Sequence, residues 1–375
     1  MLARKKRLEL FGKSKGLNGF LFTSPANVLC YSGYWYDFQT GPSPFQLIPA
    51  ALLIFADHDP AILLADNEES KSGTVHQGTA IKLYASYTYK EPLMFINSFI
   101  NEVINIFKTT KIKTGKIGIE TGHVPFEIIR KLSNIFPSIE WIDIEPDLSL
   151  LRATKDEDEI ECIKRAANLA DIGQRAVIKY AAPGMTELEL FSKVRLEMET
   201  VAGTRIPLMT DLVSGNTTAT GGGNPRVKQL EKNDLVLSDF TPCLNGYWGD
   251  SCNTIILGLP SSEQLEIFEK TKEALNLGLK ALLPGVQAYQ VDQLMRNHLK
   301  EYGEFGHHGG HGVGACYHEE PRIVPYNKMV LEAGMVVALE PAVYKKNYGI
   351  RVEHLAVVTS GAPKILTTFH HRFVQ

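Results

Sequence analysis

The chain has 375 residues, of which 44% are hydrophobic and 22% are charged, and its formal net charge is −3. This length exceeds what one hydrophobic core usually organises and predicts two domains of about 150 and about 220 residues. There is no basic excess to neutralise phosphates, and no stretch approaches the roughly 20 apolar residues that span a bilayer, so we expect neither nucleic acid nor a membrane as a partner.

The N-terminus and the cysteines predict a cytoplasmic protein. The basic start MLARKKRLEL is followed by FGKSKGLNG, where a secretory signal would carry an apolar segment. The cysteines are odd in number, scattered and without a CxxC pair: Cys30, Cys162, Cys243, Cys252 and Cys316. This pattern argues against a disulfide framework and against a zinc-thiolate site.

Residues 1–148 are predicted to form an α/β domain. Short apolar runs such as GFLFTS, ALLIFA and KIGIE alternate with helical patterns such as PLMFINSFINEVINIFK. A second domain, residues 149–375, is expected to open with a long helix whose capping box pairs Thr154 with Glu157.

The second domain contains a weak internal repeat. The segments AAPGMTELELF at 181–191 and LLPGVQAYQVD at 282–292 lie 101 residues apart. Each ends one helix with Pro-Gly and begins another, which predicts two similar αβ halves.

A hairpin is predicted around Asn245-Gly246, because both positions tolerate positive φ. Centring the turn there places Asp250 opposite Thr241 and Cys252 opposite Asp239. Asp239 and Asp250 then share a face as diagonal neighbours about 7–8 Å apart. The proline within the first strand also permits a bulge, which would change this register.

A second hairpin repeats the arrangement. A turn between Lys346 and Asn347 places Glu340 opposite Glu353. These acids could be unrelated residues near solvent, but two hairpins that each bring two acids into apolar strands favour a shared site. Four carboxylates with one or two imidazoles suit Mn²⁺, Co²⁺, Fe²⁺ or Zn²⁺, and two divalent ions would balance their charge and leave room for a bridging hydroxide.

The spacing of five residues resembles the pita-bread metallopeptidases, namely prolidase, aminopeptidase P, methionine aminopeptidase and creatinase. The residues are Asp239, Asp250, His311 in GHGVG, Glu340 in GMVVALEP and Glu353 in GIRVEH. The prolidase and aminopeptidase P branch is the most similar. The resemblance covers residues 155–375 and, more weakly, the first domain through NVLCYSGYW. It implies an α/β (α+β) fold, with an N-terminal creatinase-like α/β domain and a C-terminal pita-bread domain of pseudo-twofold αβ halves.

The resemblance also implies roles for the metal ligands. Asp239 would chelate one ion, Asp250 and Glu353 would bridge both ions, and His311 and Glu340 would complete the shell of the other. Two divalent ions are expected, Mn²⁺ or Co²⁺, with Zn²⁺ and Fe²⁺ as alternatives. A homodimer is implied by the resemblance alone.

The catalytic roles come from the same resemblance. Glu340 would shuttle the proton from the bridging water to the leaving amine. His318 would stabilise the tetrahedral intermediate, His307 would approach the leaving side of the substrate, and Arg351 would lie between the acids. Within GHHGGHGVGACYH, residues 306–318, only His311 is then a direct ligand, and His308 is expected to be structural or to face solvent.

The chain departs from the family pattern at several positions. Relatives carry a histidine seventeen residues before the first aspartate, where this chain has Gly222 in GGGNP. This loss argues against creatinase chemistry and puts ordinary peptidase efficiency in question. GDSCNT places Cys252 and Asn253 where Thr and Arg are usual, and His354 stands where an Asp often follows the last Glu.

Three other features receive simpler interpretations. TGGGNP lacks the Lys-Ser/Thr of a phosphate loop. The pair His370-His371 is expected to be solvated. Cys252 is expected to be a small buried residue, with the alternative that its thiol touches the metal shell.

The sequence therefore predicts a dimetal-dependent hydrolase, a Xaa-Pro dipeptidase or aminopeptidase that uses a metal-bridging hydroxide on small peptides. One alternative is a metal hydrolase or lyase of the same fold that acts on a small non-peptide substrate, motivated by Gly222 and GDSCNT. Another is a non-catalytic binding protein of this fold, against which the intact ligand set weighs.

Overall fold

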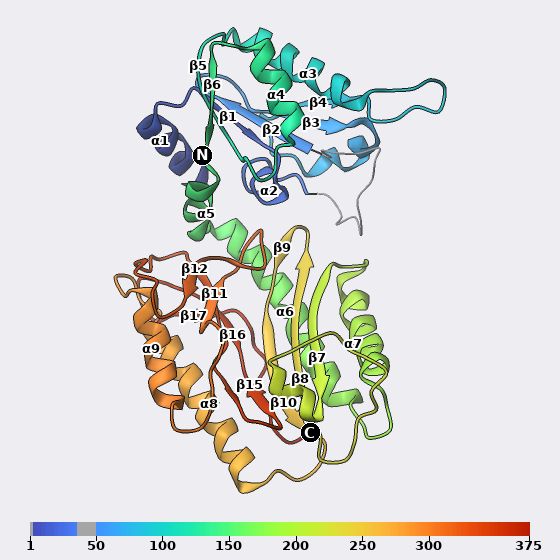
Figure 1. Ribbon diagram of the computed structural model, residues 1–375, viewed down its shortest axis with the longest axis vertical. Helices are drawn as coiled ribbons and strands as arrows, with labels where there is room; N and C mark the ends of the chain where they lie inside the picture. The colour runs from blue at the N-terminus through green and yellow to red at the C-terminus, as the bar shows by residue number, and fades with distance from the viewer. Residues whose placement is uncertain (1–2, 36–49) are drawn as a thin grey trace. The chain divides into compact units, whose positions relative to one another are not determined.

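The computed structural model describes residues 3–35 and 50–375 of the chain (Figure 1). It divides into two compact units, Met1–Arg152 and Ala153–Gln375. Within the described residues, no helix combines the length and the apolar character needed to cross a membrane.

The first unit is a six-stranded sheet with helices on both faces, in the order β4-β3-β2-β1-β5-β6. Its strands are β1 (Gly19–Phe22), β2 (Ala50–Phe55), β3 (Ala61–Ala65), β4 (Ala80–Tyr84), β5 (Gly115–Ile119) and β6 (Ile139–Asp143). Its helices are α1 (Ala3–Lys15), α2 (Pro25–Ser32), η1 (Asp66–Thr74), α3 (Phe95–Thr110), α4 (Phe126–Ile135) and α5 (Glu145–Ala153).

Two apolar cores cover the two faces of this sheet. Phe99 of α3 and Ile128 of α4 pack with Leu53 on one face. Val28 of α2 and Leu148 of α5 belong to the core on the other face. The predicted α/β character of the first unit is confirmed, because apolar residues of the strands are buried on both sides.

The second unit contains two further sheets and a two-stranded ribbon. The orders are β10-β8-β7, with β9 paired to β8, then β12-β11-β13-β16-β17, and β14-β15. The strands are β7 (Leu208–Ser214), β8 (Leu235–Leu244), β9 (Tyr247–Trp248), β10 (Ser251–Ile256), β11 (Gly310–Gly312), β12 (Glu319–Ile323), β13 (Val336–Leu339), β14 (Ala342–Tyr344), β15 (Gly349–Arg351), β16 (His354–Val357) and β17 (Lys364–Ile365). The helices are α6 (Glu157–Tyr180), α7 (Glu187–Ala202), η2 (Gly215–Thr220), α8 (Ser262–Ala281) and α9 (Ala288–Leu299).

The predicted internal repeat is confirmed as two αβ halves. Helices α6 and α7 lie along the first sheet, and α8 and α9 lie along the second (Figure 1). Gly184 and Gly285, the glycines of the two Pro-Gly pairs, both have φ of 90°. Each amide donates to a residue in a later segment, Leu230 and Leu331 respectively, so the two connections are built alike.

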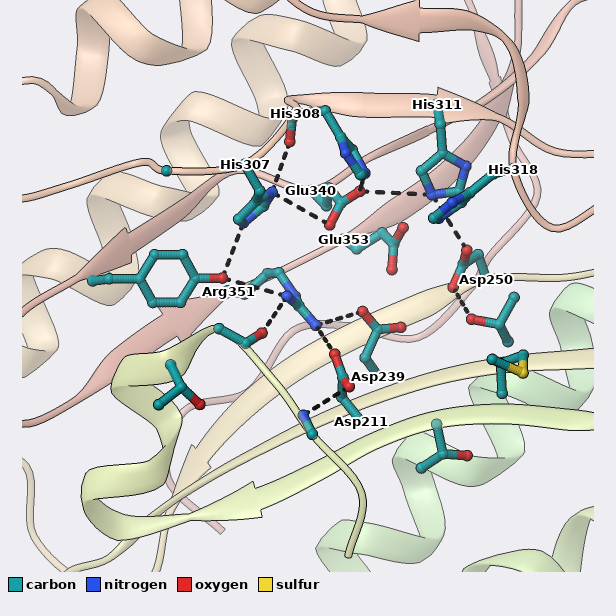
Figure 2. A pocket seen from close by; sticks show the side chains of 18 of the residues that line it. Asp211, Asp239, Asp250, His307, His308, His311, His318, Glu340, Arg351 and Glu353 are labelled. Carbon is teal, nitrogen blue, oxygen red and sulfur yellow. Dashed lines mark hydrogen bonds and ion pairs between the residues drawn. The ribbon is translucent and has the colours of Figure 1, made fainter.

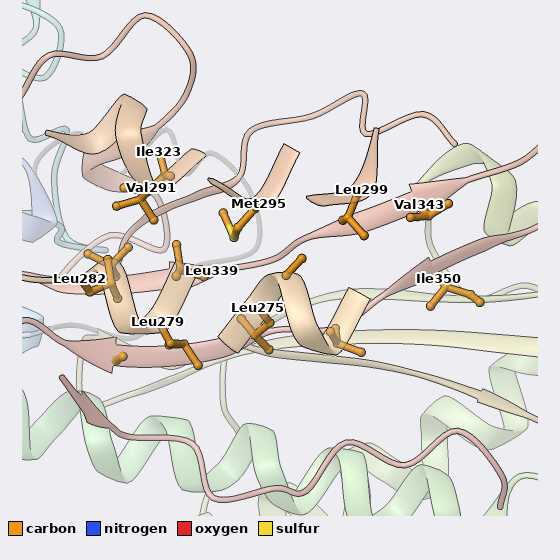
Figure 3. Close-up of a cluster of buried hydrophobic side chains, with 14 of the residues drawn as sticks. Leu275, Leu279, Leu282, Val291, Met295, Leu299, Ile323, Leu339, Val343 and Ile350 are labelled. Carbon is orange, nitrogen blue, oxygen red and sulfur yellow. The ribbon is translucent and has the colours of Figure 1, made fainter. Parts of the chain in front are cut away.

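The core of the second half is a set of hydrophobic, mostly aliphatic side chains between its helices and its sheet (Figure 3). Leu275 and Leu279 come from α8, Met295 comes from α9, and Leu339 comes from β13. A Cβ at Gly278 of α8 would lie 2.7 Å from the Met295 sulfur, so the helices approach closely at this glycine. This packing supports the strand that leads into Glu340.

The predicted start of the long helix is wrong by two residues. Asp156, rather than Thr154, is the N-cap, and its amide donates to Glu159 Oε2 at 2.9 Å. Thr154 instead forms an antiparallel bridge with Met335. This strand-like pairing keeps the backbone extended and moves the cap toward the C-terminus.

The two predicted hairpin registers agree with the structure. Cys252 pairs with Asp239 across β10 and β8. In the second hairpin, Leu339 pairs with His354 on β16, and Ala342 pairs with Arg351 on β15. Glu340 and Glu353 therefore occupy matching positions between the two ladders.

Candidate metal centre

All of the predicted site residues line one cavity of about 670 Å³ in the second unit (Figure 2). These residues are Asp239, Asp250, His307, His311, His318, Glu340, Arg351 and Glu353. They come from both αβ halves of the unit, so the cavity is completed only where the halves meet.

The first hairpin supplies the buried carboxylate of Asp250 and the largely buried carboxylate of Asp239. Thr241 Oγ1 donates a hydrogen bond to Asp250 Oδ1 at 2.9 Å, as the pairing of their strands predicts. Asp239 Oδ2 accepts from Arg351 Nη2 at 2.7 Å. The other oxygen of Asp239, Oδ1, is buried and has no hydrogen-bond partner.

The second hairpin supplies Glu340 and Glu353, which are only 6% and 1% exposed. The backbone amide of Glu353 donates to Cys252 O at 3.0 Å, which joins the two hairpins. Glu353 Oε2 is buried without a hydrogen-bond partner. Such an oxygen is costly to bury unless a cation or a donor reaches it.

His311 lies on β11 between two glycines that the packing requires. A Cβ at Gly310 would lie 2.1 Å from Ala338 O, and one at Gly312 would lie 2.2 Å from Glu320 O. The imidazole Nδ1 lies 3.0 Å from Gly312 O and must donate, because a carbonyl oxygen only accepts. Nε2 therefore presents its lone pair to the cavity, which suits a metal ligand.

His311 Nε2 lies 3.6 Å from Asp250 Oδ2 and 3.6 Å from Glu340 Oε1. Asp250, His311 and Glu353 each offer a ligand atom within 4.8 Å of the others. Burial lowers the pKa of His311 to about 4, so its ring is neutral near pH 7. A neutral imidazole beside carboxylates is the form that binds a divalent ion.

The carboxylates repel one another in the metal-free protein. Burial raises the pKa of Asp239 to about 7. The Arg351 guanidinium opposes this shift, whereas the neighbouring carboxylates add to it. Burial and the nearby carboxylates also raise the pKa values of Asp250 and Glu353 well above the ordinary range. Cations placed among these groups would remove the cause of the repulsion.

Glu340 has a different environment from the other acids. Burial alone would raise its pKa, but a hydrogen bond from His308 and two neighbouring imidazoles hold it well below the ordinary value. His308 Nε2 lies 2.8 Å from Glu340 Oε1. Glu340 is therefore the carboxylate most readily kept ionised in the metal-free protein.

His307 and His318 lie on the cavity wall. His307 Nδ1 donates to His308 O at 2.7 Å, so Nε2 accepts from the Tyr344 hydroxyl at 2.9 Å. The ring of His318 lies 4.2 Å from the ring of His311, measured between centroids. Burial lowers the pKa of His318, which leaves a ring able to donate one hydrogen bond without carrying charge.

Sequence reasoning missed three residues of this cavity. His308, expected to be structural or solvent-facing, contacts Glu340, and Tyr344 contacts His307. Asp211 pairs with Asp239 across β7 and β8 and forms an ion pair of 2.9 Å with Arg351. The only sequence signal for Asp211 was the unusual glycine at 222, whose missing side chain leaves space in this wall.

The remaining predictions near the site have mixed outcomes. Cys252 is fully buried, and its sulfur accepts from Arg351 Nε at 3.3 Å. The expectation that His371 is solvated is wrong, because its Nε2 lies 3.0 Å from Glu353 O and its ring lies 4.3 Å from that of His354. His370 is exposed, as expected.

Two family descriptions match the chain. Residues 161–360 match Metallopeptidase family M24, and residues 4–154 match the Creatinase/Prolidase N-terminal domain. An Xaa-Pro dipeptidase of Pyrococcus furiosus is 30% identical over 371 residues, which cover 98% of each chain.

Solved structures with similar folds extend over both units. The X-Pro aminopeptidase of Thermotoga maritima has a TM-score of 0.81 and 27% identity, with 99% of each chain covered. An Xaa-Pro dipeptidase of Bacillus anthracis has a TM-score of 0.83 and 25% identity, also with 99% of each chain covered.

Proposed function

Because the chain belongs to metallopeptidase family M24, with a creatinase-like N-terminal domain and a pita-bread C-terminal domain, we propose that it is a dimetal-dependent Xaa-Pro peptidase. The substrate would be a small peptide, cleaved by a dipeptidase or aminopeptidase reaction. One observation carries the proposal: three buried carboxylates, the largely buried carboxylate of Asp239 and one neutral imidazole converge on a single cavity.

The residues present fit a pair of divalent ions. Two buried oxygens, Asp239 Oδ1 and Glu353 Oε2, have no hydrogen-bond partner. The donor set is rich in oxygen with one nitrogen, which suits Mn²⁺ or Co²⁺ and also admits Zn²⁺ or Fe²⁺. The ions would be held by Asp239, Asp250, His311, Glu340 and Glu353.

Paired divalent ions, when bound, polarise a carbonyl and make water nucleophilic at neutral pH. Glu340 would accept the proton from that water on a carboxylate oxygen and pass it to the leaving amine. His308, whose Nε2 lies 2.8 Å from Glu340 Oε1, favours the ionised form of this carboxylate.

Two further histidines would act on the substrate. His318 would donate a hydrogen bond to the oxygen that becomes negative as the carbonyl is attacked. His307, oriented by its own bond to the neighbouring backbone and by Tyr344, would contact the leaving side. Arg351 touches Asp239 and would hold that ligand in place.

The test combines metal content with peptide hydrolysis. The protein should take up about two equivalents of Mn²⁺ or Co²⁺ on reconstitution and cleave Xaa-Pro peptides. Glu340→Gln should abolish turnover and leave the folded structure intact, whereas the exposed control Glu332→Gln should keep full activity. A protein that binds no transition metal, or cleaves no Xaa-Pro peptide when loaded, contradicts the proposal.

A second candidate is a hydrolase or lyase of the same fold that acts on a small non-peptide substrate. The observation that favours it is the altered wall at Gly222, where Asp211 reaches the cavity. A panel of small amides and zwitterionic osmolytes, compared with dipeptides, separates the two candidates. We also propose a cytoplasmic homodimer, for which sedimentation velocity is the direct measurement of the oligomeric state.

A further inference from the structure

The cavity wall beside Gly222 is filled by an acidic side chain. A Cβ placed on Gly222 would lie 2.0 Å from Asp211 Oδ2 and 2.4 Å from Asp211 Cγ. A side chain at position 222 and the observed Asp211 carboxylate therefore exclude each other. In this chain the carboxylate of Asp211 occupies the space that the side chain of a larger residue at position 222 would fill.

Asp211 is held in place by two hydrogen bonds and remains open to the cavity. Its Oδ1 accepts from the Gly223 amide at 2.8 Å, and its Oδ2 accepts from Arg351 Nη2 at 2.9 Å (Figure 2). The side chain is 35% exposed and lines the cavity. A carboxylate offers about four acceptor positions, so two remain for a ligand.

Arg351 has no donor left for a substrate. A guanidinium carries five N–H groups. Nε donates to a sulfur, Nη1 donates to a carbonyl and a hydroxyl, and Nη2 donates to two carboxylates. The five partners are Cys252, Gly221, Tyr344, Asp211 and Asp239.

Among the described residues, no other permanently charged cationic side chain lines the cavity. Among the described residues that line it, Arg351 is the only arginine, and there is no lysine. His307 donates from Nδ1 to a carbonyl oxygen and accepts at Nε2 from the Tyr344 hydroxyl, which is the pattern of a neutral ring. Two divalent ions would balance the four ligand carboxylates, and Asp211 balances Arg351. A substrate carboxylate placed against Asp211 would meet like charge without compensation.

We propose that Asp211 is a specificity-determining residue that binds a cationic group of the substrate and rejects a carboxylate at this part of the cavity. The inference rests on the proposed peptidase function. The substrate class it names is peptides that present a protonated amine here, such as a free amino terminus, and keep any carboxylate elsewhere.

The experiment measures how Asp211 responds to ligand charge. Titration calorimetry on the Mn²⁺-loaded protein compares prolinamide, which is a cation, with the neutral N-acetylprolinamide. The wild type should bind prolinamide at least about tenfold more tightly, and Asp211→Asn should lose that preference. Asp211→Glu, which retains the charge, should recover part of it, and metal content should be measured for every variant.

Glu304→Gln is the matched control. Glu304 is an exposed carboxylate that lines the same cavity, and its loss should leave the prolinamide preference unchanged. Equal changes in the two variants would show a general effect of negative charge and overturn the local role of Asp211. A loss of affinity for both ligands alike in Asp211→Asn would show that the residue only positions Arg351, which also overturns the proposal.

Steady-state kinetics separates this inference from the proposed function. The ratio of kcat/KM for Ala-Pro-amide over Ala-Pro should fall at least about tenfold from wild type to Asp211→Asn. If the wild type cleaves no peptide yet prefers prolinamide through Asp211, the proposed function fails and the charge selection stands. If it cleaves both peptides and Asp211→Asn leaves the ratio unchanged, the function stands and the charge selection is overturned.

Discussion

Gly222→Ala should destabilise the second unit, because the new Cβ would collide with the carboxylate of Asp211. Position 222 does not have the left-handed φ that disfavours an L-residue, so its backbone accepts alanine. The new Cβ would lie 2.0 Å from Asp211 Oδ2 and 2.8 Å from Oδ1, closer than any real contact. The carboxylate must rotate away, which breaks its hydrogen bonds to the Gly223 amide and to Arg351.

The magnitude follows from those two bonds. Hydrogen bonds to charged groups contribute about 1.5–3 kcal/mol each, which gives an upper limit of about 6 kcal/mol. The side chain is 35% exposed. Water therefore replaces part of the lost bonding, so we expect the two hydrogen bonds to contribute about half of the upper limit to the free energy of unfolding. Alanine lowers the conformational entropy of the unfolded chain, which stabilises the folded state by about 0.4–1 kcal/mol. The expected net loss in the free energy of unfolding is about 2 kcal/mol.

Urea unfolding of the metal-free protein, followed by tryptophan fluorescence, measures this loss. Trp248 is buried in the second unit, so replacing Trp35 and Trp141 with Phe in every variant confines the signal to that unit. In an Asp211→Ala background the same Gly222→Ala change should stabilise the protein by about 0.4–1 kcal/mol, because only the effect on the unfolded chain remains, which gives a coupling energy of about 3 kcal/mol. An equal cost in both backgrounds would refute the steric exchange.

Three other outcomes are expected. Glu340→Gln should lower kcat by at least about 10²-fold in the metal-loaded enzyme, as measured with an Xaa-Pro peptide, because the proton carrier is lost. Gly310→Ala should cost more than about 3 kcal/mol, because its Cβ would meet Ala338 O at 2.1 Å in a rigid sheet, while the control Gly361→Ala, whose Cβ has only a contact at 4.0 Å, should leave the urea midpoint unchanged. In the metal-free protein the raised pKa of Asp239, about 7, means that the folded state keeps a proton that the unfolded chain has released above about pH 4. The buried histidines have lowered pKa values and act in the opposite sense, so the contribution of Asp239 is isolated as the difference in unfolding free energy between wild type and Asp239→Asn, which should fall as the pH rises from about 4 to about 7. Saturating Mn²⁺ should remove that decline, and a difference that rises over this pH range in the metal-free protein would contradict the assignment.

The sequence predicted the parts of the site that depend on strand geometry. A two-residue turn at Asn245-Gly246 determines which residues oppose each other, so the pairing of Cys252 with Asp239 could be worked out from the turn alone. The repeat was visible because Pro-Gly connections need particular residues at particular places.

Contacts between distant segments could not be predicted in the same way. Thr154 has the residue pattern of a helix cap, but its bridge to Met335 depends on a strand that comes much later in the chain. Asp211 reads as an ordinary strand residue until the neighbouring backbone at Gly222 is placed against it. His371 looked like a solvated residue near the C-terminus because its partner, Glu353 O, is distant in the sequence.

The division of the site between two αβ halves links cation binding to the docking of those halves. Thr254 Oγ1 in the first half donates to Arg351 O in the second at 2.9 Å, and the Glu353 amide donates to Cys252 O at 3.0 Å. An ion that touches both hairpins acts as a reversible cross-link whose affinity includes the free energy of bringing the halves together. Thermodynamic reciprocity then requires that a mutation at the seam that weakens docking weakens cation affinity by the same factor, even where it touches no ligand.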